Sequence, residues 1–226
     1  MKKKYDSIQK KHYDKHARKR RASSNSTMSD NYVRSCETKF ILEQIKKIPN
    51  NSLKILDIGC GNGYTLSLLS KLSKSYQLTG FEPNDLLRQI AKNRLKKKAN
   101  IINANIRDYN KFDKKYDLII CQRILINIQN YRDQKKALKN ILKLSKKNTK
   151  FLIIEAFISG LQNLNLIRKK FKLNTLKAGN YNKYLPDNFF NNKYLKKINH
   201  KNENILSSYY LIARVFHPYY LKANNE

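Results

Sequence analysis

The chain has 226 residues and carries 48 Lys and Arg against 16 Asp and Glu, so its formal net charge is +32. This length can bury the core of one α/β domain. The longest apolar runs, such as residues 151–158, are far shorter than the roughly 20 residues that span a bilayer, so no membrane span is predicted. No apolar segment follows the charged N-terminal residues, which argues against a secretory signal.

The three cysteines, Cys36, Cys60 and Cys121, are widely scattered along the chain. They form no closely spaced pair, so the sequence predicts neither a disulfide framework nor a metal site. A reduced, cytoplasmic compartment is the default expectation.

The positive charge is spread over the whole chain, and only residues 2–21 form a dense basic block. Lys contributes 37 of the basic residues and Arg only 11, although Arg is the side chain that best recognises phosphate. A nucleic-acid partner is therefore possible but not favoured, and most of the charge is expected on a solvated surface.

Residues 1–28 are basic and polar, and they predict a flexible arm or a lid that orders on binding. Residues 29–226 are expected to form a single domain. Apolar residues recur at helical spacing from Asp30 onward, which predicts a first helix of that domain. Asn84 or Asp85 is expected to cap a later helix.

Five short apolar segments alternate with helical patterns along the first two thirds of the chain. They are residues 53–58, 76–81, 100–104, 116–121 and 150–157. Strands that alternate with helices of this length form βαβ units and a parallel sheet. Right-handed crossovers then predict a doubly wound α/β arrangement.

The last third of the chain has a different pattern. Residues 159–193 are aromatic and rich in Asn, and they are expected to be an insertion that covers a substrate. Residues 194–200 and 207–216 are expected to be two final strands that pair antiparallel. The complete sheet would then be mostly parallel and seven-stranded.

A glycine-rich turn follows the first predicted strand and carries the strongest chemical signal. Asp57 precedes Gly59, Gly61 and Gly63 at the junction of this strand with the next helix. Glycines let a backbone turn tightly and approach a ligand closely. The dinucleotide fingerprint requires a further glycine where this chain has Tyr64, so the turn is better suited to a ligand with an adenosine and an amino-acid tail than to a pyrophosphate.

Glu82 closes the second predicted strand, about 20 residues beyond the glycine turn. At this spacing a carboxylate reaches the hydroxyls of a bound ribose, and its two oxygens can accept both of them. A glycine turn and a Glu before Pro83 could each be ordinary loop features. Together, between a strand and a helix, they predict a nucleoside site.

The segment Ile55–Gly63, ILDIGCGNG, resembles the first motif of the class I S-adenosylmethionine-dependent methyltransferases, and the likeness covers roughly residues 30–216. The resemblance implies a Rossmann-like methyltransferase fold with S-adenosylmethionine as cofactor. It implies that the three glycines line the methionine end, that Asp57 meets its amino group and that Glu82 binds the ribose. The cofactor-binding set is then Asp57, Gly59, Cys60, Gly61, Gly63, Glu82, Pro83, Asn105, Ile106 and Cys121.

Asn105 stands where this family usually has an Asp that binds the adenine amino group. Its carbonyl oxygen can accept the same hydrogen bond, and Ile106 would then pack on the adenine. The alternative is that Asn105 only caps a loop.

The segment Cys121–Ile128 follows the fourth predicted strand and resembles an R-x-L-I-N signature of one subgroup of these enzymes. It contributes Arg123 and Asn127 to the predicted catalytic set, together with Glu155 and Arg168. Arg123 and Arg168 could hold an anionic group of a substrate.

Glu155 interrupts an apolar strand where the ligand is expected, and a buried charge needs a partner. It could form a structural ion pair with Arg123 or Arg168, or it could serve as the general base for a hydroxyl acceptor. His16 is the second candidate for that base.

Three functions remain open at this stage. The first is an S-adenosylmethionine-dependent methyltransferase (EC 2.1.1.-) that methylates oxygen on a small molecule or glycan-type acceptor. The second is an RNA methyltransferase that uses the basic surface. The third is a non-catalytic basic binding module on the same fold. The sequence predicts no oligomeric state.

Overall fold

The computed structural model describes residues 2–24, 27–49, 52–111, 113–191 and 203–224. It divides the chain into two units, Met1–Glu155 and Ala156–Glu226, and each is described by itself. The boundary expected between residues 28 and 29 stays a prediction.

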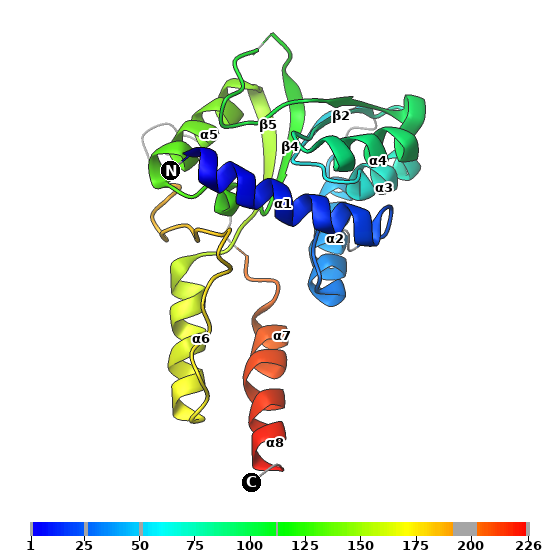
Figure 1. Cartoon of the computed structure of the whole chain (residues 1–226). Helices are drawn as coiled ribbons and strands as arrows, with labels where there is room; N and C mark the ends of the chain where they lie inside the picture. The colour runs from blue at the N-terminus through cyan, green and yellow to red at the C-terminus, as the bar shows by residue number, and fades with distance from the viewer. Residues whose placement is uncertain (1, 25–26, 50–51, 112, 192–202, 225–226) are drawn as a thin grey trace. The chain divides into compact units, whose positions relative to one another are not determined.

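The first unit is built on a parallel sheet whose strands follow the apolar segments of the sequence (Figure 1). The strand order is β3-β2-β1-β4-β5. Ile58 at the end of β1 is level with Phe81 in β2 and with Cys121 in β4. The carboxyl ends of these three strands therefore meet at one edge. The strands are β1 (Lys54–Ile58), β2 (Gln77–Phe81), β3 (Ala99–Ile102), β4 (Tyr116–Gln122) and β5 (Ser145–Ile154).

Two helices of the first unit begin at polar residues whose side chains cap them. Asp30 accepts a hydrogen bond from the backbone N–H of Val33 at the start of α2 (Asn31–Lys46), and Asn84 caps α4 (Asp85–Leu95) in the same way through Leu87. The remaining helical elements of this stretch are α3 (Tyr64–Leu72), η1 (Lys96–Lys98), η2 (Leu125–Asn127) and α5 (Tyr131–Lys143). Figure 1 shows α3 and α4 together near β2, and α5 beside β5.

Apolar side chains of α2, α3 and α4 pack with those of β1, β2 and β4 in one buried cluster. Ile41, Leu66 and Leu118 are all fully buried in it. At roughly 25 cal/mol per Å² of buried apolar surface, this packing is the main force that fixes the sheet and therefore its carboxyl edge.

The basic block forms a helix, α1 (Lys2–Arg20), in the first unit. The side chain of Gln9 donates to the backbone oxygen of Asn127, at the end of η2. Further along α1, Asp14 accepts a 2.7 Å bond from the side chain of Asn84, after β2. Just beyond α1, the backbone oxygens of Arg21 and Ser23 accept bonds of 3.1 and 2.7 Å from the Asn62 side chain in the glycine turn. The helix thus lies over three loops at the carboxyl edge (Figure 1).

The second unit is mostly helical in its described residues. It contains α6 (Ile158–Lys170), α7 (Ser207–Leu211), the π-helical turn η3 (Ile212–Phe216) and α8 (His217–Ala223). The rings of Phe216 and Tyr219 meet Phe171 edge to face, with centroids 5.8 and 5.1 Å apart, which joins the C-terminal run to the end of α6.

Two expectations for the sheet were wrong. The described residues form a five-stranded, entirely parallel sheet rather than one of seven strands. Residues 207–216 are helical and not a strand, so no antiparallel pair is formed with them; the other expected strand, 194–200, lies outside the described residues.

The physical reason lies in the spacing of the buried side chains. Aromatic and β-branched residues in 207–216 favour a strand by propensity, but short apolar runs fit either structure. Leu206 and Val215 are the buried positions of this region, and Phe216 and Tyr219 both reach Phe171. That three-residue spacing is helical.

Candidate cofactor and substrate site

The turn after β1 requires its glycines. Gly59, Gly61 and Gly63 have φ angles of +69°, +57° and +74°, a region that other residues rarely adopt. A Cβ atom on Gly59 would lie 2.1 Å from Cδ1 of Ile124, and one on Gly63 would lie 2.8 Å from Cδ1 of Leu95. The turn is therefore a tight cradle of bare backbone that begins α3.

Two acidic side chains flank this cradle, at the ends of adjacent strands. Asp57 and Glu82 are 4% and 5% exposed. Glu82 accepts 2.8 Å hydrogen bonds from the backbone N–H groups of Gly61 and Asn84, one on each carboxylate oxygen. It therefore ties the glycine turn to the loop after β2.

Burial raises the pKa of both carboxyl groups to about 7. For Glu82 the amide bonds from Asn84 and Gly61 oppose this rise, followed by the charge of Arg88. For Asp57 the charge of Arg34 opposes the rise, while the charge of Glu82 adds to it. Two buried acids this close are stabilised in their charged forms by hydrogen-bond donors or a cation.

Arg34 of α2 supplies part of that compensation. Its guanidinium donates to the side chains of Gln122 at 2.7 Å and Thr65 at 3.2 Å, and it lies 5.6 Å from the ring centre of Tyr64. Burial lowers its pKa, and the charges of Asp57 and Glu37 oppose that change.

A ligand with an ammonium group and two hydroxyls would complete this site. S-adenosylmethionine carries both, so the acids and the bare glycine backbone fit the cofactor that the first motif implies. The fit rests on Asp57 and Glu82, because they present negative charge at the cradle.

The predicted adenine-binding residues lie in the loop after β3. The Asn105 side-chain oxygen accepts a 3.0 Å bond from the backbone N–H of Arg107, which is the loop-capping geometry. Ile106 is buried, and its backbone oxygen accepts a 2.8 Å bond from the side chain of Asn140. The geometry supports a capping role for Asn105, and adenine binding by either residue stays a prediction.

The other predicted cofactor residues lie around the same edge, where the two cysteines are buried and Pro83 is exposed. Cys60 and Cys121 are 5% and 0% exposed, and burial raises the pKa of both thiols well above the usual value. The Pro83 carbonyl accepts a 3.1 Å bond from Arg88. All three cysteines of the chain, Cys36 included, are free thiols.

Glu155, just after β5, is held by the loop that follows β4. Its carboxylate accepts hydrogen bonds from three consecutive backbone N–H groups, those of Ile124 at 2.9 Å, Leu125 at 2.8 Å and Ile126 at 3.2 Å. Burial raises its pKa to about 7, and these amides and the charge of Arg123 oppose the rise. This carboxylate caps η2, as an acidic side chain caps a helix N-terminus.

Arg123 has a different partner from the one expected. Its guanidinium pairs with Glu37 of α2, with Nη2 at 2.6 Å and Nε at 2.7 Å from one carboxylate oxygen. The other oxygen of Glu37 accepts a 2.7 Å bond from Gln122, which itself accepts from Arg34. Arg123 also has a left-handed φ of 55°.

The sequence reading missed this network, which fixes α2 to the end of β4. Glu37 is fully buried and Arg34 is 8% exposed. The sequence did contain a signal for it, because Glu37 follows Arg34 by three residues on the helix face that also carries Val33 and Ile41.

Asn127 links the loop after β4 to α1. Its side-chain nitrogen donates to the hydroxyl of Tyr13 and to the backbone oxygen of Arg123, both at 2.7 Å. His16 lies one turn beyond Tyr13 on the same helix. Its Nδ1 is buried and has no hydrogen-bond partner among the described residues, and burial lowers its pKa, helped by Arg20, Lys15 and Lys19.

Arg168 belongs to the second unit. It is 7% exposed, and its guanidinium donates to the backbone oxygens of Asn174, at 2.7 Å, and Arg214. These bonds hold the end of α6 to the following loop and to η3, so the described contacts of Arg168 are structural. The structure does not join it to the other three predicted catalytic residues, which lie in the first unit.

Among the described residues, no cluster of three or more His, Cys, Asp or Glu could hold a metal ion. In the same part of the chain, no helix has both the length and the apolar character that a membrane crossing needs.

Comparisons with known proteins agree with the first motif. A family described as a methyltransferase domain matches residues 30–203. No curated protein matches the chain.

Three solved structures are similar to part of this chain at low sequence identity. A sugar N-methyltransferase from Streptoalloteichus has 15% identity and a TM-score of 0.48, covering 55% of this chain and 50% of its own. An amino pentose methyltransferase from Micromonospora echinaspora has 16% identity and a TM-score of 0.48, with coverage of 54% and 51%. An N-methyltransferase from Bradyrhizobium japonicum has 18% identity and a TM-score of 0.48, with coverage of 60% and 68%.

The likeness covers only about half the length of the first two structures. The family assignment therefore rests on the domain match, which extends from the start of α2 into the second unit. With this match over more than half of its residues, the chain belongs to the S-adenosylmethionine-dependent methyltransferase family.

Proposed function

We propose that the chain transfers a methyl group from S-adenosylmethionine to an oxygen of a small molecule or glycan-type acceptor. The single observation that carries the proposal is the pair of buried acids, Asp57 and Glu82, beside a turn of three left-handed glycines. When bound, S-adenosylmethionine supplies a methyl group that its positive sulfur has already activated.

The residues of the turn then have separate tasks. Asp57 would meet the amino group of the methionine end, and Glu82 would accept the ribose hydroxyls. The tight turn at Gly59 and Gly61 lets the backbone approach the ligand. Because transfer from a sulfonium needs no protein nucleophile, the protein contributes alignment and exclusion of water.

We propose that α1 is the element that excludes water. It contacts the loops after β2 and β4 through Asn84 and Asn127, and the chain just beyond it contacts the loop after β1 through Asn62. Thr27 lies next to the glycine turn, 3.0 Å from the position that a Cβ on Gly61 would occupy. Residues 1–28 therefore act as a lid, and this segment must open for ligand exchange.

The acceptor side has two candidate bases. The Glu155 carboxylate accepts three backbone amides, which favours a positioning role over proton transfer. His16 has an unpartnered buried Nδ1 among the described residues and a lowered pKa, so it is neutral at pH 7 and able to accept a proton. We assign the base for a hydroxyl acceptor to His16 and the shaping of the Arg123–Asn127 loop to Glu155.

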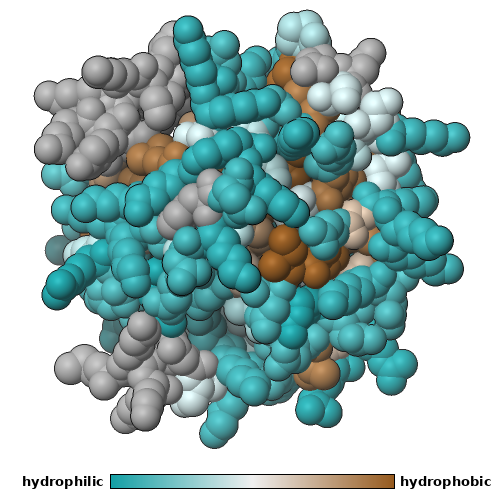
Figure 2. Space-filling model, turned by 90° about the horizontal axis from the view of Figure 1, so that it is seen from above, coloured by the Kyte–Doolittle hydropathy of each residue, from teal (hydrophilic) through white to brown (hydrophobic). Residues whose placement is uncertain are grey.

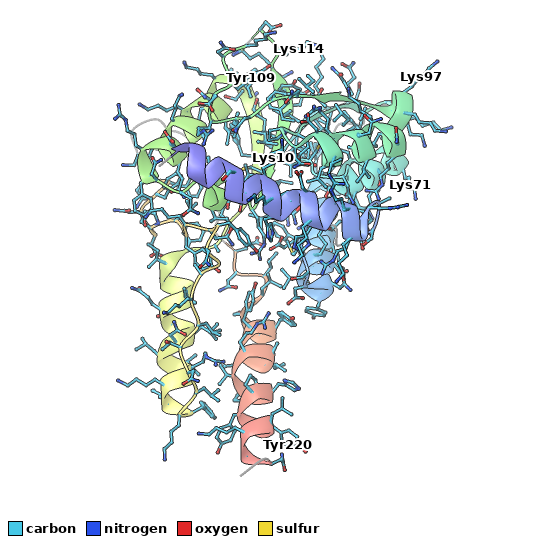
Figure 3. All side chains as sticks on the ribbon, in the orientation of Figure 1. Lys10, Lys71, Lys97, Tyr109, Lys114 and Tyr220 are labelled. Atoms are coloured by element: carbon cyan, nitrogen blue, oxygen red, sulfur yellow. The ribbon has the colours of Figure 1, made fainter. Side chains whose placement is uncertain are left out.

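An RNA acceptor is the second candidate, and the basic block of α1 is the observation that favours it. Against it, the lysines labelled in Figure 3 stand on separate elements, with Lys10 on α1, Lys71 on α3 and Lys97 on η1. Figure 2 likewise shows hydrophilic side chains over most of the face in view. A scattered positive surface favours general attraction of anions over a defined RNA groove.

Two further expectations belong with this proposal. The free thiols support a cytoplasmic location. The Arg123 and Asn127 signature supports membership of the R-x-L-I-N subgroup, and residues 159–193 are proposed to cover the acceptor.

Incorporation of a labelled methyl group into fractionated cell extract tests the function. Wild type should label a small-molecule or glycan fraction, and Asp57→Asn should label it at least tenfold less. An Asp85→Asn control changes an exposed acid near the site and should label it normally. Labelling confined to the RNA fraction would contradict the proposed acceptor, and S-adenosylmethionine binding without any labelling would favour the non-catalytic module.

A further inference from the structure

The C-terminal helical run of the second unit leaves a cluster of apolar side chains exposed. Residues 207–223 form one continuous run of α7, η3 and α8. Of the large apolar side chains that are exposed in the described part of the chain, five lie within this run, namely Ile212, Phe216, Tyr219, Tyr220 and Leu221. A monomeric protein seldom exposes so many large apolar groups together, so the cluster marks an interaction surface.

One side of the run is already packed within its own unit. Val215 is fully buried, and Phe216 and Tyr219 rest partly on Phe171. Arg168 donates to the backbone of Arg214. These contacts hold the run in place and leave its outer side uncovered, with Tyr220 at 65% and Ile212 at 59% exposure.

Exposed cations stand on the same run and beside Phe171, on which it packs. Lys169, Lys170 and Lys172 are exposed on both sides of Phe171, and Arg214 and Lys222 are exposed on the run itself. Residues 207–223 contain no Asp or Glu. The surface therefore combines aromatic and aliphatic groups with positive charge only.

We propose that this run binds the surface of an anionic lipid bilayer. Aromatic and aliphatic side chains insert at the boundary between headgroups and acyl chains, while Lys and Arg contact lipid phosphates. At 1.5 Å per residue the run is about 25 Å long, less than the roughly 30 Å hydrocarbon core, so it lies in the interface rather than crossing it.

Charge argues against the other occupants. Two copies of a chain that each carry +32 repel one another, which disfavours a dimer through this surface. Nucleic acid could contact the cations through its phosphates and stack its bases on the tyrosines, but it has no apolar surface that would bury Ile212 and Leu221. An anionic bilayer accepts the apolar and the charged groups together.

The absence of Trp from the chain allows a direct test. In the full-length Tyr220→Trp variant the only indole stands near the end of α8, where Figure 3 shows Tyr220. The vesicles contain phosphatidylcholine and roughly one third phosphatidylglycerol, which gives them a negative surface potential. They should shift the emission of the indole to the blue, and brominated acyl chains should quench this emission. Tyr32→Trp, at another exposed tyrosine, should show neither change.

Vesicle flotation with the otherwise native chain separates insertion from bulk charge. The double variant Tyr220→Ser and Leu221→Ser should lower binding at least tenfold, and Tyr32→Ser should lower it less than twofold. Equal binding by wild type and the double variant would overturn the proposal, because charge alone then explains it. Failure to bind would also overturn it, as would a dimer in light scattering that the double variant loses. An unchanged circular dichroism spectrum and melting temperature confirm that these exposed substitutions leave the fold intact.

Discussion

The two ends of the carboxyl edge hold buried carboxylates in different ways. At the structural end, Glu155 accepts three amides from one loop. At the ligand end, Glu82 accepts one amide from each of two loops and, with Asp57, stands beside bare glycine backbone, with the charge of Arg34 near Asp57. Burial raises all three pKa values to about 7. The raised pKa therefore does not distinguish a ligand site from a structural one, and the hydrogen-bond donors around each acid do.

The largest expected effect concerns the structural end. Glu155→Ala leaves three backbone N–H groups without an acceptor and should lower the free energy of unfolding by about 3 kcal/mol. Glu155→Gln keeps an acceptor oxygen and should lower that free energy by less than half as much. Urea unfolding followed by circular dichroism measures both. Equal stability of Glu155→Ala and wild type would remove the contrast between the two ends.

The ligand end should respond in affinity as well as in stability, because Glu82 also accepts hydrogen bonds from the backbone N–H groups of Gly61 and Asn84. Glu82→Ala removes the carboxylate proposed to accept two ribose hydroxyls and should weaken S-adenosylmethionine binding about a hundredfold, or roughly 2.7 kcal/mol. Calorimetric titration measures it, with Asp85→Ala as the matched acid. If Glu155→Gln weakened binding as much as Glu82→Ala, the division of roles would be wrong.

A smaller effect is expected from pH in the ligand-free protein. Burial raises the pKa of Glu82 in the folded protein from its usual value to about 7. Its ionisation therefore lowers stability as pH rises from about 5 to 7. Relative to Glu82→Gln, wild type should lose about 1–2 kcal/mol of unfolding free energy between pH 5 and 8. A difference between the two proteins that stays constant with pH would show that Glu82 is not desolvated.

The smallest effect concerns the lid. Tyr13→Phe removes one hydrogen bond to Asn127 and should raise the dissociation rate of S-adenosylmethionine about threefold, as expected for the loss of roughly 0.7 kcal/mol. Stopped-flow displacement measures the rate. Tyr32→Phe is the control, and equal rates in all three proteins would argue against a lid closed by this contact.

The comparison also shows what the sequence could predict. Sequence patterns predicted those features whose interacting residues are close together in the chain. The apolar segments around Ile58 and Phe81 marked the strands, and Asp30 and Asn84 cap the helices expected after them. The glycine turn could be predicted because its three left-handed residues are adjacent in sequence.

Partners distant in sequence could not be predicted in the same way. Glu37 meets Arg123 across 86 positions, and Glu155 meets the amides near Leu125 across 30. Only packing of α2 and β5 on β4 brings these groups together. The helix at residues 207–216 was missed because Tyr, Ile and Val favour strands locally, while packing on Phe171 favours helical spacing.

Cofactor binding by the two buried acids is tested most directly by calorimetric titration of the wild-type chain with S-adenosylhomocysteine near pH 6.5, in two buffers of different ionisation enthalpy. Binding that favours ionised Asp57 and Glu82 lowers their pKa values from about 7 and releases protons. We expect one binding site with proton release that Glu82→Gln reduces. Absence of binding, or binding without proton release, would contradict this expectation.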